Sequence, residues 1–295
     1  MKAERPLSPW DLPAGHPGIS YLVGHTPLFA LSGDPRFSYC LYVPRDHNAD
    51  GPPSPLVVAI HGTRRRAETL RDAFADFAEE HGCVVLAPLF PAGITGPNDL
   101  DSYKLLDPSA LRADELLLDM VDEIAARWHV DADRFHLHGF SGGGQFAHRF
   151  TYLHPERLAS LSVGAPGRVT LLDPTRPWWQ GTADVQELFG TTAASPSAMR
   201  RLPVQMIVGE LDTATDGLAP AGQRPAPATG TNRAEYLRAL YENWREAGID
   251  AQLDTVPGVA HDQLGVLPAV KSFFADRIAT QSGGTSGASG VDGTS

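Results

Sequence analysis

Short, uninterrupted apolar runs alternate with helical patterns along most of this chain, and this alternation restricts its fold more than any other feature. The run at 56–60, Leu-Val-Val-Ala-Ile, is rich in β-branched residues and shows no polar alternation. Runs of this kind are typical of strands that are buried on both faces of a parallel sheet. Their alternation with helices predicts an α/β fold, with a mainly parallel, doubly wound central sheet and helices on both faces.

The predicted sheet has about eight strands. Two opening strands are expected at 19–29 and 37–43, on either side of a Gly-Asp-Pro turn. The buried runs lie at 56–60, 83–87, 135–140, 158–163, 204–208 and 251–256. Amphipathic helices are predicted over 67–81, 109–128, 146–152, 233–247 and 266–279.

The composition of the remaining segments predicts the domain organisation. Residues 1–19 are rich in proline, which indicates an irregular N-terminal arm, and residues 20–280 are expected to form a single domain. Residues 168–202 show no clear period and are interpreted as a small cap or long loop after the sixth strand. Residues 281–295 are mostly Ser, Gly and Thr, which predicts a disordered tail.

Charge and cysteine content exclude several classes of function. The 295-residue chain has a formal net charge of −11, which argues against nonspecific nucleic-acid binding or an anionic membrane surface. Small molecules are the expected partners. Cys40 and Cys83 lie in apolar runs without metal-type spacing and are expected to be buried thiols. Neither an apolar leader nor a run long enough to cross a bilayer is present, so we expect a cytoplasmic protein.

The run at 135–140 ends in a glycine-rich turn, Gly139-Phe140-Ser141-Gly142-Gly143, where a helical pattern begins. A serine hydroxyl attacks a carbonyl group only if it is lifted clear of its neighbours and served by a base. A tight turn from strand to helix meets the first need, so Ser141 is a candidate nucleophile. Gly142 would offer its backbone N–H to the developing oxyanion. A serine in such a turn also arises by chance in a chain with 29 glycines.

Two further polar residues follow later strand runs. Asp212 comes after 204–208 and His261 comes after the last run. Ligands of parallel sheets lie beyond the carboxyl ends of the strands, where Ser141, Asp212 and His261 would meet. His261 would take the Ser141 proton, and Asp212 would hold the imidazole in the useful tautomer.

Alternatives remain for both partners of the serine. Asp212 is otherwise a turn or helix-cap residue, and Asp216 and Glu210 compete with it as the acid. His261 is otherwise a surface histidine. The histidines expected to pack in the central strand or to point away from the hydroxyl are His136, His138, His148 and His154.

Further site residues are predicted from position alone. Thr63 follows His61-Gly62 at a strand end and is placed to give the second oxyanion N–H, unless this is an ordinary turn. Trp178 and Trp179 are expected to line an acyl or aryl pocket or, alternatively, to form the core of the cap.

Three consecutive arginines, Arg64-Arg65-Arg66, precede the helix at 67–81. Cations at a helix N-terminus are locally unfavourable, so something must offset them. Either they pair with the acidic surface, or at least one binds an anionic group of the substrate. Arg64 is a candidate substrate-binding residue on the second interpretation.

Four of these segments together resemble the α/β-hydrolases, in the neighbourhood of esterases and polyester depolymerases. They are His61-Gly62-Thr63, Gly139-Phe140-Ser141-Gly142-Gly143, Gly209-Glu210-Leu211-Asp212 and Gly258-Val259-Ala260-His261, and the resemblance covers 37–280. The single His-Gly departs from the His-Gly-Gly-Gly of some lipases. The resemblance implies the α/β-hydrolase fold and cleavage of carboxylic esters without a cofactor or metal, but no particular substrate.

Other functions use similar residues. The same three side chains could act on a thioester or an amide, or transfer the acyl group to an acceptor other than water. A binding protein could keep the fold without catalysis. A dinucleotide-binding oxidoreductase is disfavoured, because 139–144 lacks the required glycine spacing and the downstream acid.

Overall fold

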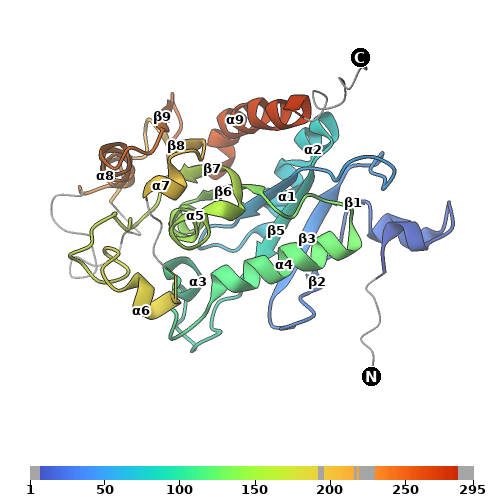
Figure 1. Cartoon of the computed structure of the whole chain (residues 1–295), viewed down its shortest axis with the longest axis horizontal. Coiled ribbons are helices and arrows are strands. Elements are labelled where there is room, and N and C mark those ends of the chain that lie inside the picture. The colour runs from blue at the N-terminus through green and yellow to red at the C-terminus, as the bar shows by residue number, and fades with distance from the viewer. Residues whose placement is uncertain (1–6, 192–195, 216–217, 219–229, 285–295) are drawn as a thin grey trace, which may run out of the picture.

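A computed structural model describes residues 7–191, 196–215, 218 and 230–284 of the chain, and Figure 1 shows a twisted central sheet flanked by helices. Within these residues the sheet has nine strands. They are β1 (Gly24–His25), β2 (Phe29–Ala30), β3 (Ser38–Val43), β4 (Leu56–Ile60), β5 (Val84–Leu89), β6 (Phe135–Phe140), β7 (Leu158–Gly164), β8 (Val204–Gly209) and β9 (Ala251–Val256).

The strand order confirms the predicted mainly parallel sheet. The strands are arranged β1-β3-β5-β4-β6-β7-β8-β9, and β2 also pairs with β3. All pairs from β5 to β9 are parallel, whereas β1, β2 and β5 pair with β3 in the antiparallel sense. The buried run of β4 lies between β5 and β6, so it is covered on both edges as well as on both faces.

The strand predicted at 19–29 is present only in part. Pro17–Tyr21 forms a short 3-10 helix, and only the two-residue strands β1 and β2 follow it. Proline explains the difference, because Pro17 starts the helical turn and Pro27, which lacks an N–H, separates β1 from β2. The arm before it holds a second 3-10 turn, Pro9–Asp11. Residues 1–6 lie outside the described residues, and the boundary of the domain at residue 20 stays a prediction.

The helices lie close to their predicted positions, with one exception. The segment 67–81 is two helices, because the backbone at Phe74 departs from helical geometry (φ −98°, ψ −1°). The main helices are α1 (Ala67–Ala73), α2 (Ala75–His81), α4 (Ala113–Arg127), α5 (Gly142–Leu153), α8 (Arg233–Glu246) and α9 (Gln263–Gly284). Shorter helices are α3 (Ser102–Leu105), α6 (Val185–Phe189) and α7 (Pro196–Met199).

The helices form two layers on the sheet. On one face, α9 packs beside α2, where Lys271 lies over the ring of Phe74 and Phe274 contacts His136. On the other face, α5 and α8 meet through the hydrogen bond from the Trp244 indole to the Tyr152 hydroxyl. Figure 1 shows α4 and α5 on the near face of the sheet and α9 beyond it.

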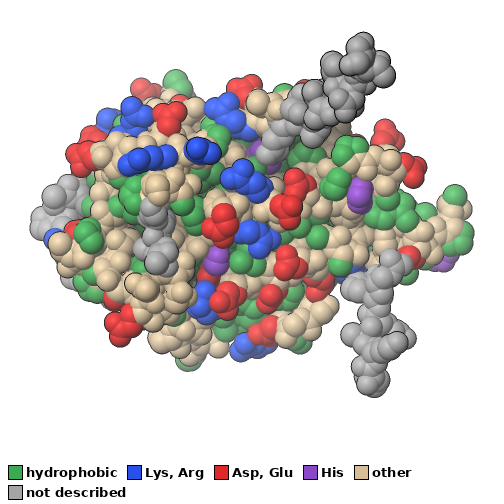
Figure 2. Space-filling model, in the orientation of Figure 1, with side chains coloured by type: hydrophobic (Ala, Val, Ile, Leu, Met, Phe, Trp, Pro, Cys, Tyr) green, Lys and Arg blue, Asp and Glu red, His purple; other side chains and the backbone are tan. Residues whose placement is uncertain are grey.

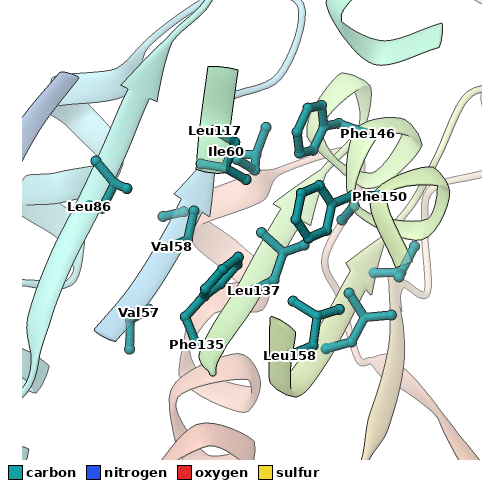
Figure 3. Packing of buried hydrophobic residues seen from close by; sticks show 14 of the residues in the cluster. Val57, Val58, Ile60, Leu86, Leu117, Phe135, Leu137, Phe146, Phe150 and Leu158 are labelled. Carbon is teal, nitrogen blue, oxygen red and sulfur yellow. The ribbon is translucent and has the colours of Figure 1, made fainter. Parts of the chain in front are cut away.

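The core under α4 and α5 is built from aromatic and branched side chains. Figure 3 shows Phe146 and Phe150 of α5 directed at Leu137 and Phe135 of β6, with Leu117 of α4 beside them. All of these residues are fully buried. Burial of each large apolar side chain contributes about 1.5–3 kcal/mol, so this interface anchors the helix that begins directly after Ser141.

A row of hydrogen-bonded polar side chains crosses four strands inside the sheet. His138 of β6 contacts the Ser162 hydroxyl of β7 at 3.1 Å, and that hydroxyl donates to Oε1 of Gln205 on β8 at 2.8 Å. The Gln205 amide in turn donates to Asp254 of β9 at 2.7 Å. The first three side chains are buried. Because buried polar groups need their partners, this row fixes how β6, β7, β8 and β9 line up.

Two predicted irregular segments contain helix. In the segment 168–202, α6 and α7 are short helices, with residues 192–195 outside the described part. At the C-terminus α9 continues to Gly284, so the prediction of disorder is wrong for 281–284, whereas 285–295 lie outside the described residues. Gly283 and Gly284, two poor helix formers in succession, stand where the helix ends.

The surface is charged, and the cysteines are internal. Figure 2 shows acidic and basic side chains interspersed over the face on which α4 and α5 lie. Among the described residues, no helix is both long enough and apolar enough to span a bilayer. Cys40 and Cys83 are free and buried, which confirms the expectation for both thiols.

Candidate active site

Ser141 stands in a tight turn between β6 and α5. Its backbone adopts φ 58° and ψ −112°, a region that costs a non-glycine residue about 1–3 kcal/mol. The turn is held from outside, because the Ser141 N–H donates to the Gly164 carbonyl at the end of β7 at 2.8 Å. Glycine is required beside it, since a Cβ on Gly139 would lie 2.1 Å from the Gly143 carbonyl oxygen.

His261 connects Ser141 to Asp212. Its Nε2 lies 3.0 Å from the Ser141 hydroxyl and its Nδ1 lies 2.6 Å from Oδ2 of Asp212. The Asp212 side chain is fully buried, whereas that of His261 is 28% exposed. With a proton on Nδ1, the imidazole donates to the carboxylate and accepts from the hydroxyl. The structure therefore brings together the three side chains predicted from the strand ends, and their catalytic roles remain a prediction.

Two loops place Asp212 and His261. Asp212 lies just after β8, where its N–H donates to the Gly209 carbonyl at 3.1 Å. His261 lies between β9 and α9, and the N–H of Leu211 donates to the Val259 carbonyl at 2.8 Å, which ties the two loops together. The ring of Phe140 packs against the His261 ring, with centroids 4.8 Å apart.

The competing residues have other positions. Glu210 accepts a hydrogen bond from the Gly258 N–H at 2.9 Å, and Asp216 lies outside the described residues. The other histidines near Ser141 are engaged elsewhere. His136 contacts Ser160, His138 contacts Ser162, His148 contacts the Gly144 carbonyl, and His154 contacts Asp114.

Thr63 lies against Gly142. Its backbone nitrogen and its hydroxyl are each 3.0 Å from the position that a Cβ on Gly142 would occupy. The Tyr103 hydroxyl would be 2.6 Å from the same position, so any side chain at 142 would displace both neighbours. The two predicted oxyanion donors are thus adjacent, and their use by a substrate remains a prediction.

Helix α3 contributes residues that the sequence reasoning missed. Tyr103 donates to the His61 carbonyl at 3.1 Å, and the Lys104 ammonium donates to the Thr63 hydroxyl at 3.0 Å. Both residues are buried. The only local signal was the i,i+3 spacing of Asp101 and Lys104, whose charged groups lie 2.6 Å apart. That spacing is common on helix surfaces.

The arginines after Thr63 divide into two kinds. The Arg65 guanidinium donates to the carbonyls of Phe90 at 2.9 Å, Thr63 at 2.8 Å and Leu100 at 3.1 Å, so it ties three loops together. Arg64 and Arg66 are exposed. A role for Arg64 in substrate binding remains a prediction.

The two tryptophans face different surroundings. The Trp178 indole N–H donates to the carbonyls of Leu105 at 3.0 Å and Leu106 at 3.1 Å, and its ring lies 5.1 Å from that of Phe189. The Trp179 ring has the guanidinium groups of Arg149 and Arg168 each 5.6 Å from its centroid. Trp178 therefore joins the 168–202 segment to the end of α3, whereas Trp179 lies against cations.

A buried arginine, also missed from the sequence, reaches the acid. Nη1 of Arg233, the first residue of α8, lies 3.7 Å from Oδ1 of Asp212 and donates to the Ala214 carbonyl at 3.3 Å. Both side chains are buried. His261 and Arg233 thus contact different oxygens of one carboxylate.

Burial governs the ionisation of several groups around the site. It lowers the pKa of His61 to about 4, so this imidazole is neutral when it accepts from the Phe90 N–H at 3.0 Å. It also lowers the pKa of Arg149 to about 9 and that of Lys104 from its usual value.

Among the described residues, no group of three or more His, Cys, Asp or Glu side chains is arranged to hold a metal ion.

Comparison with known proteins gives structural relatives only. No protein-family model matches the chain, and no curated protein matches it in sequence. A poly(3-hydroxybutyrate) depolymerase from Bordetella parapertussis has a similar structure, with TM-score 0.67 and 24% identity over 81% of this chain and 84% of its own. Poly(aspartic acid) hydrolase-1 from Sphingomonas sp. KT-1 has TM-score 0.70 and 21% identity over 84% and 97%.

An S-formylglutathione hydrolase from Agrobacterium tumefaciens is a further structural relative, with TM-score 0.55 and 17% identity over 82% of this chain and 89% of that one. All three likenesses extend over more than four fifths of both chains.

Proposed function

Because the chain has the α/β-hydrolase fold, we propose that it is a serine hydrolase that cleaves carboxylic esters through an acyl-serine intermediate. The observation that carries this proposal is the position of His261, whose two ring nitrogens lie 3.0 Å from the Ser141 hydroxyl and 2.6 Å from the Asp212 carboxylate. This is the geometry that a base needs to activate a serine and to be oriented by an acid.

The proposed reaction has two halves. The Ser141 oxygen attacks the ester carbonyl carbon while its proton passes to Nε2 of His261. The tetrahedral intermediate collapses when the C–O bond to the alcohol breaks and His261 returns the proton to the departing oxygen. Water, deprotonated by His261, then attacks the acyl-serine, and the carboxylic acid leaves as Ser141 regains its proton. Asp212 stabilises the imidazolium in both halves.

Two backbone N–H groups are assigned to the oxyanion. Thr63 and Gly142 lie side by side next to Ser141, which supports this assignment. Loss of one such donor typically costs about 2.7–4 kcal/mol of barrier, or roughly 10²–10³ in kcat. The expected substrate is a small or oligomeric ester, and a cytoplasmic location stays a prediction.

A substrate panel tests the proposal. We expect turnover of 4-nitrophenyl esters, with a profile over acyl length that measures the pocket, and Ser141→Ala should abolish it. A soluble polyester, a thioester and an amide, each with and without an added alcohol, separate hydrolysis of esters from the other reactions of the same three residues.

Covalent labelling provides an independent measurement. A fluorophosphonate should modify Ser141 alone, because its hydroxyl contacts a histidine that a carboxylate orients. Peptide mass spectrometry locates the adduct. Labelling that persists in Ser141→Ala, or no turnover of any ester or amide by the folded protein, would contradict the proposal.

A further inference from the structure

Three cationic side chains and one carboxylate gather beside Thr63. Asp101 lies 2.6 Å from the Lys104 ammonium and 2.9 Å from the Arg168 guanidinium. Arg149 lies beneath them, where its guanidinium and that of Arg168 contact the same Trp179 ring. We call Asp101, Lys104, Arg149 and Arg168 the cation cluster.

Two connections place the cation cluster next to Ser141. Lys104 donates at 3.0 Å to the Thr63 hydroxyl, which is itself against Gly142. Arg168 follows the end of β7, where the Gly164 carbonyl accepts from the Ser141 N–H at 2.8 Å. The cluster therefore borders the predicted oxyanion donors from the side of α3 and β7.

The charges of the cation cluster do not balance. Among the described residues, Asp101 is the one carboxylate in ion-pair contact with Lys104 and Arg168, and no carboxylate forms an ion pair with Arg149. The cations are nevertheless buried, with Lys104 5%, Arg149 0% and Arg168 9% exposed. Nη2 of Arg149 is buried and has no hydrogen-bond partner among the described residues. Buried positive charge without compensation is costly, and an anion that enters beside it recovers part of that cost.

Hydrogen-bond donors remain for such an anion. Of the three ammonium N–H groups of Lys104, one points to Asp101 and one to Thr63. Arg168 has five N–H donors, and within the described part of the chain one of them reaches an acceptor, Oδ2 of Asp101. The Asp101 side chain is 37% exposed and so competes with any incoming anion for the same donors.

We propose that the cation cluster is a subsite for a carboxylate of the substrate, so that the enzyme prefers esters that carry a negative charge near the scissile carbonyl. This inference rests on the proposed ester hydrolysis. Lys104 and Arg168 supply the direct contacts, and Arg149 adds positive charge beneath them. Arg guanidinium and Lys ammonium are the groups that bind carboxylates most strongly in proteins.

Two matched pairs of esters test the preference for a negative charge on the acyl side and on the alcohol side of the ester bond. On the acyl side, mono-4-nitrophenyl adipate is compared with 4-nitrophenyl hexanoate. On the alcohol side, 3-(butyryloxy)propanoate is compared with propyl butyrate. In at least one pair we expect kcat/KM to be about tenfold or more higher for the anion at low salt, and the ratio to fall as salt rises.

Substitutions of opposite charge sign distinguish a subsite from a merely structural cluster. Lys104→Gln and Arg168→Gln should lower the ratio of anionic to neutral kcat/KM about tenfold. Asp101→Asn, which removes the competing carboxylate but keeps its shape, should raise it. A structural role would lower activity on both substrates in all three variants. Arg134→Gln, on an exposed arginine before β6, is the control.

Failure of this inference differs from failure of the proposed function. If both members of each pair are hydrolysed equally, or the neutral ester is preferred at low salt, the subsite is refuted while ester hydrolysis stands. If no ester is hydrolysed, calorimetric binding of adipate to the wild-type protein decides, and absence of binding refutes the subsite. If the variants do not fold, the salt dependence of the wild-type ratio decides.

Discussion

Arg233 touches the carboxylate oxygen of Asp212 that His261 leaves free. Its Nη1 lies 3.7 Å from Oδ1, while Nδ1 of His261 lies 2.6 Å from Oδ2. Arg233 is therefore a positioning residue, which holds the Asp212 carboxylate in place for His261.

The first prediction concerns the removal of that cation. Arg233→Gln should lower kcat roughly 10- to 10²-fold, because the carboxylate that orients His261 is then held less firmly. Arg233→Lys, which keeps the charge, should restore most of kcat. Steady-state kinetics on a 4-nitrophenyl ester measure both effects.

A matched arginine on the same helix controls for indirect effects. Arg245 is on the exposed face of α8 and pairs with Asp250 at 2.9 Å. Arg245→Gln should leave kcat unchanged. An unchanged kcat in a folded Arg233→Gln variant would show that the guanidinium does not influence the site.

At the level of elements, the turn from β6 to α5 depends on close backbone packing. Gly139→Ala would bring a Cβ to 2.1 Å from the Gly143 carbonyl oxygen, so the turn must open and Ser141 must move. We expect a loss of kcat of roughly 10² or more, since misplacement of a reacting group by about 1 Å has this effect. Steady-state kinetics and urea unfolding measure the two consequences.

Gly33→Ala is the control for this substitution, because nothing lies within 4 Å of its Cβ position. That variant should keep its activity and its stability within about 0.5 kcal/mol. Full activity of Gly139→Ala would mean that the turn tolerates a wider geometry than the structure shows.

Elements with a strong local pattern could be predicted from the sequence. The run of β4 is continuous and apolar, and those of β6 and β8 are mainly apolar, with His136, His138 and Gln205 among the apolar residues. Thr63, Ser141 and Asp212 follow the ends of these three strands, as the sequence predicts. The strand expected at 19–29 formed only as β1 and the start of β2, because two prolines override its apolar composition. The break at Phe74 has no sequence signal, since both helices share one amphipathic pattern.

Some site residues were not predicted because they belong to helices that are distant in sequence and reach the site only through packing. Lys104 and Arg233 belong to α3 and α8, and neither follows a strand end. Their positions depend on how these helices rest against Thr63 and Asp212, which a one-dimensional pattern does not contain. Because both residues are charged, the sequence indicates ordinary surface residues. The structure shows instead that both side chains are buried.

Across the whole molecule, buried neutral histidines make stability depend on pH. Burial lowers the pKa of His61 and His138 to about 4 and that of His148 well below its usual value of 6.5. Between pH 6.5 and 4 the unfolded chain binds protons that the folded protein does not. Their stabilisation is therefore complete above about pH 6.5 and is lost as the pH falls toward 4.

The proton uptake by these histidines on unfolding gives the free energy of unfolding a measurable slope against pH. We expect the free energy of unfolding to fall by roughly 4–6 kcal/mol between pH 7 and pH 5, since each such histidine contributes up to about 1.4 kcal/mol per pH unit. Urea unfolding at several pH values measures the slope. His138→Gln should reduce the slope of the free energy of unfolding against pH by the contribution of one proton, about 1.4 kcal/mol per pH unit. His16→Gln, at an exposed position, should leave this slope unchanged. A slope near zero in this range would mean that these imidazoles ionise without unfolding.

The polar row through His138, Ser162, Gln205 and Asp254 bears on which parts of the protein can change without moving the site residues. It joins β6, β8 and β9, the strands that end at Ser141, Asp212 and His261, and it lies inside the sheet rather than in the loops. The row thus aligns these strands without any residue of the segment 168–202. Substitutions at exposed positions of that segment should therefore change the range of substrates accepted without changing the distances among the three side chains.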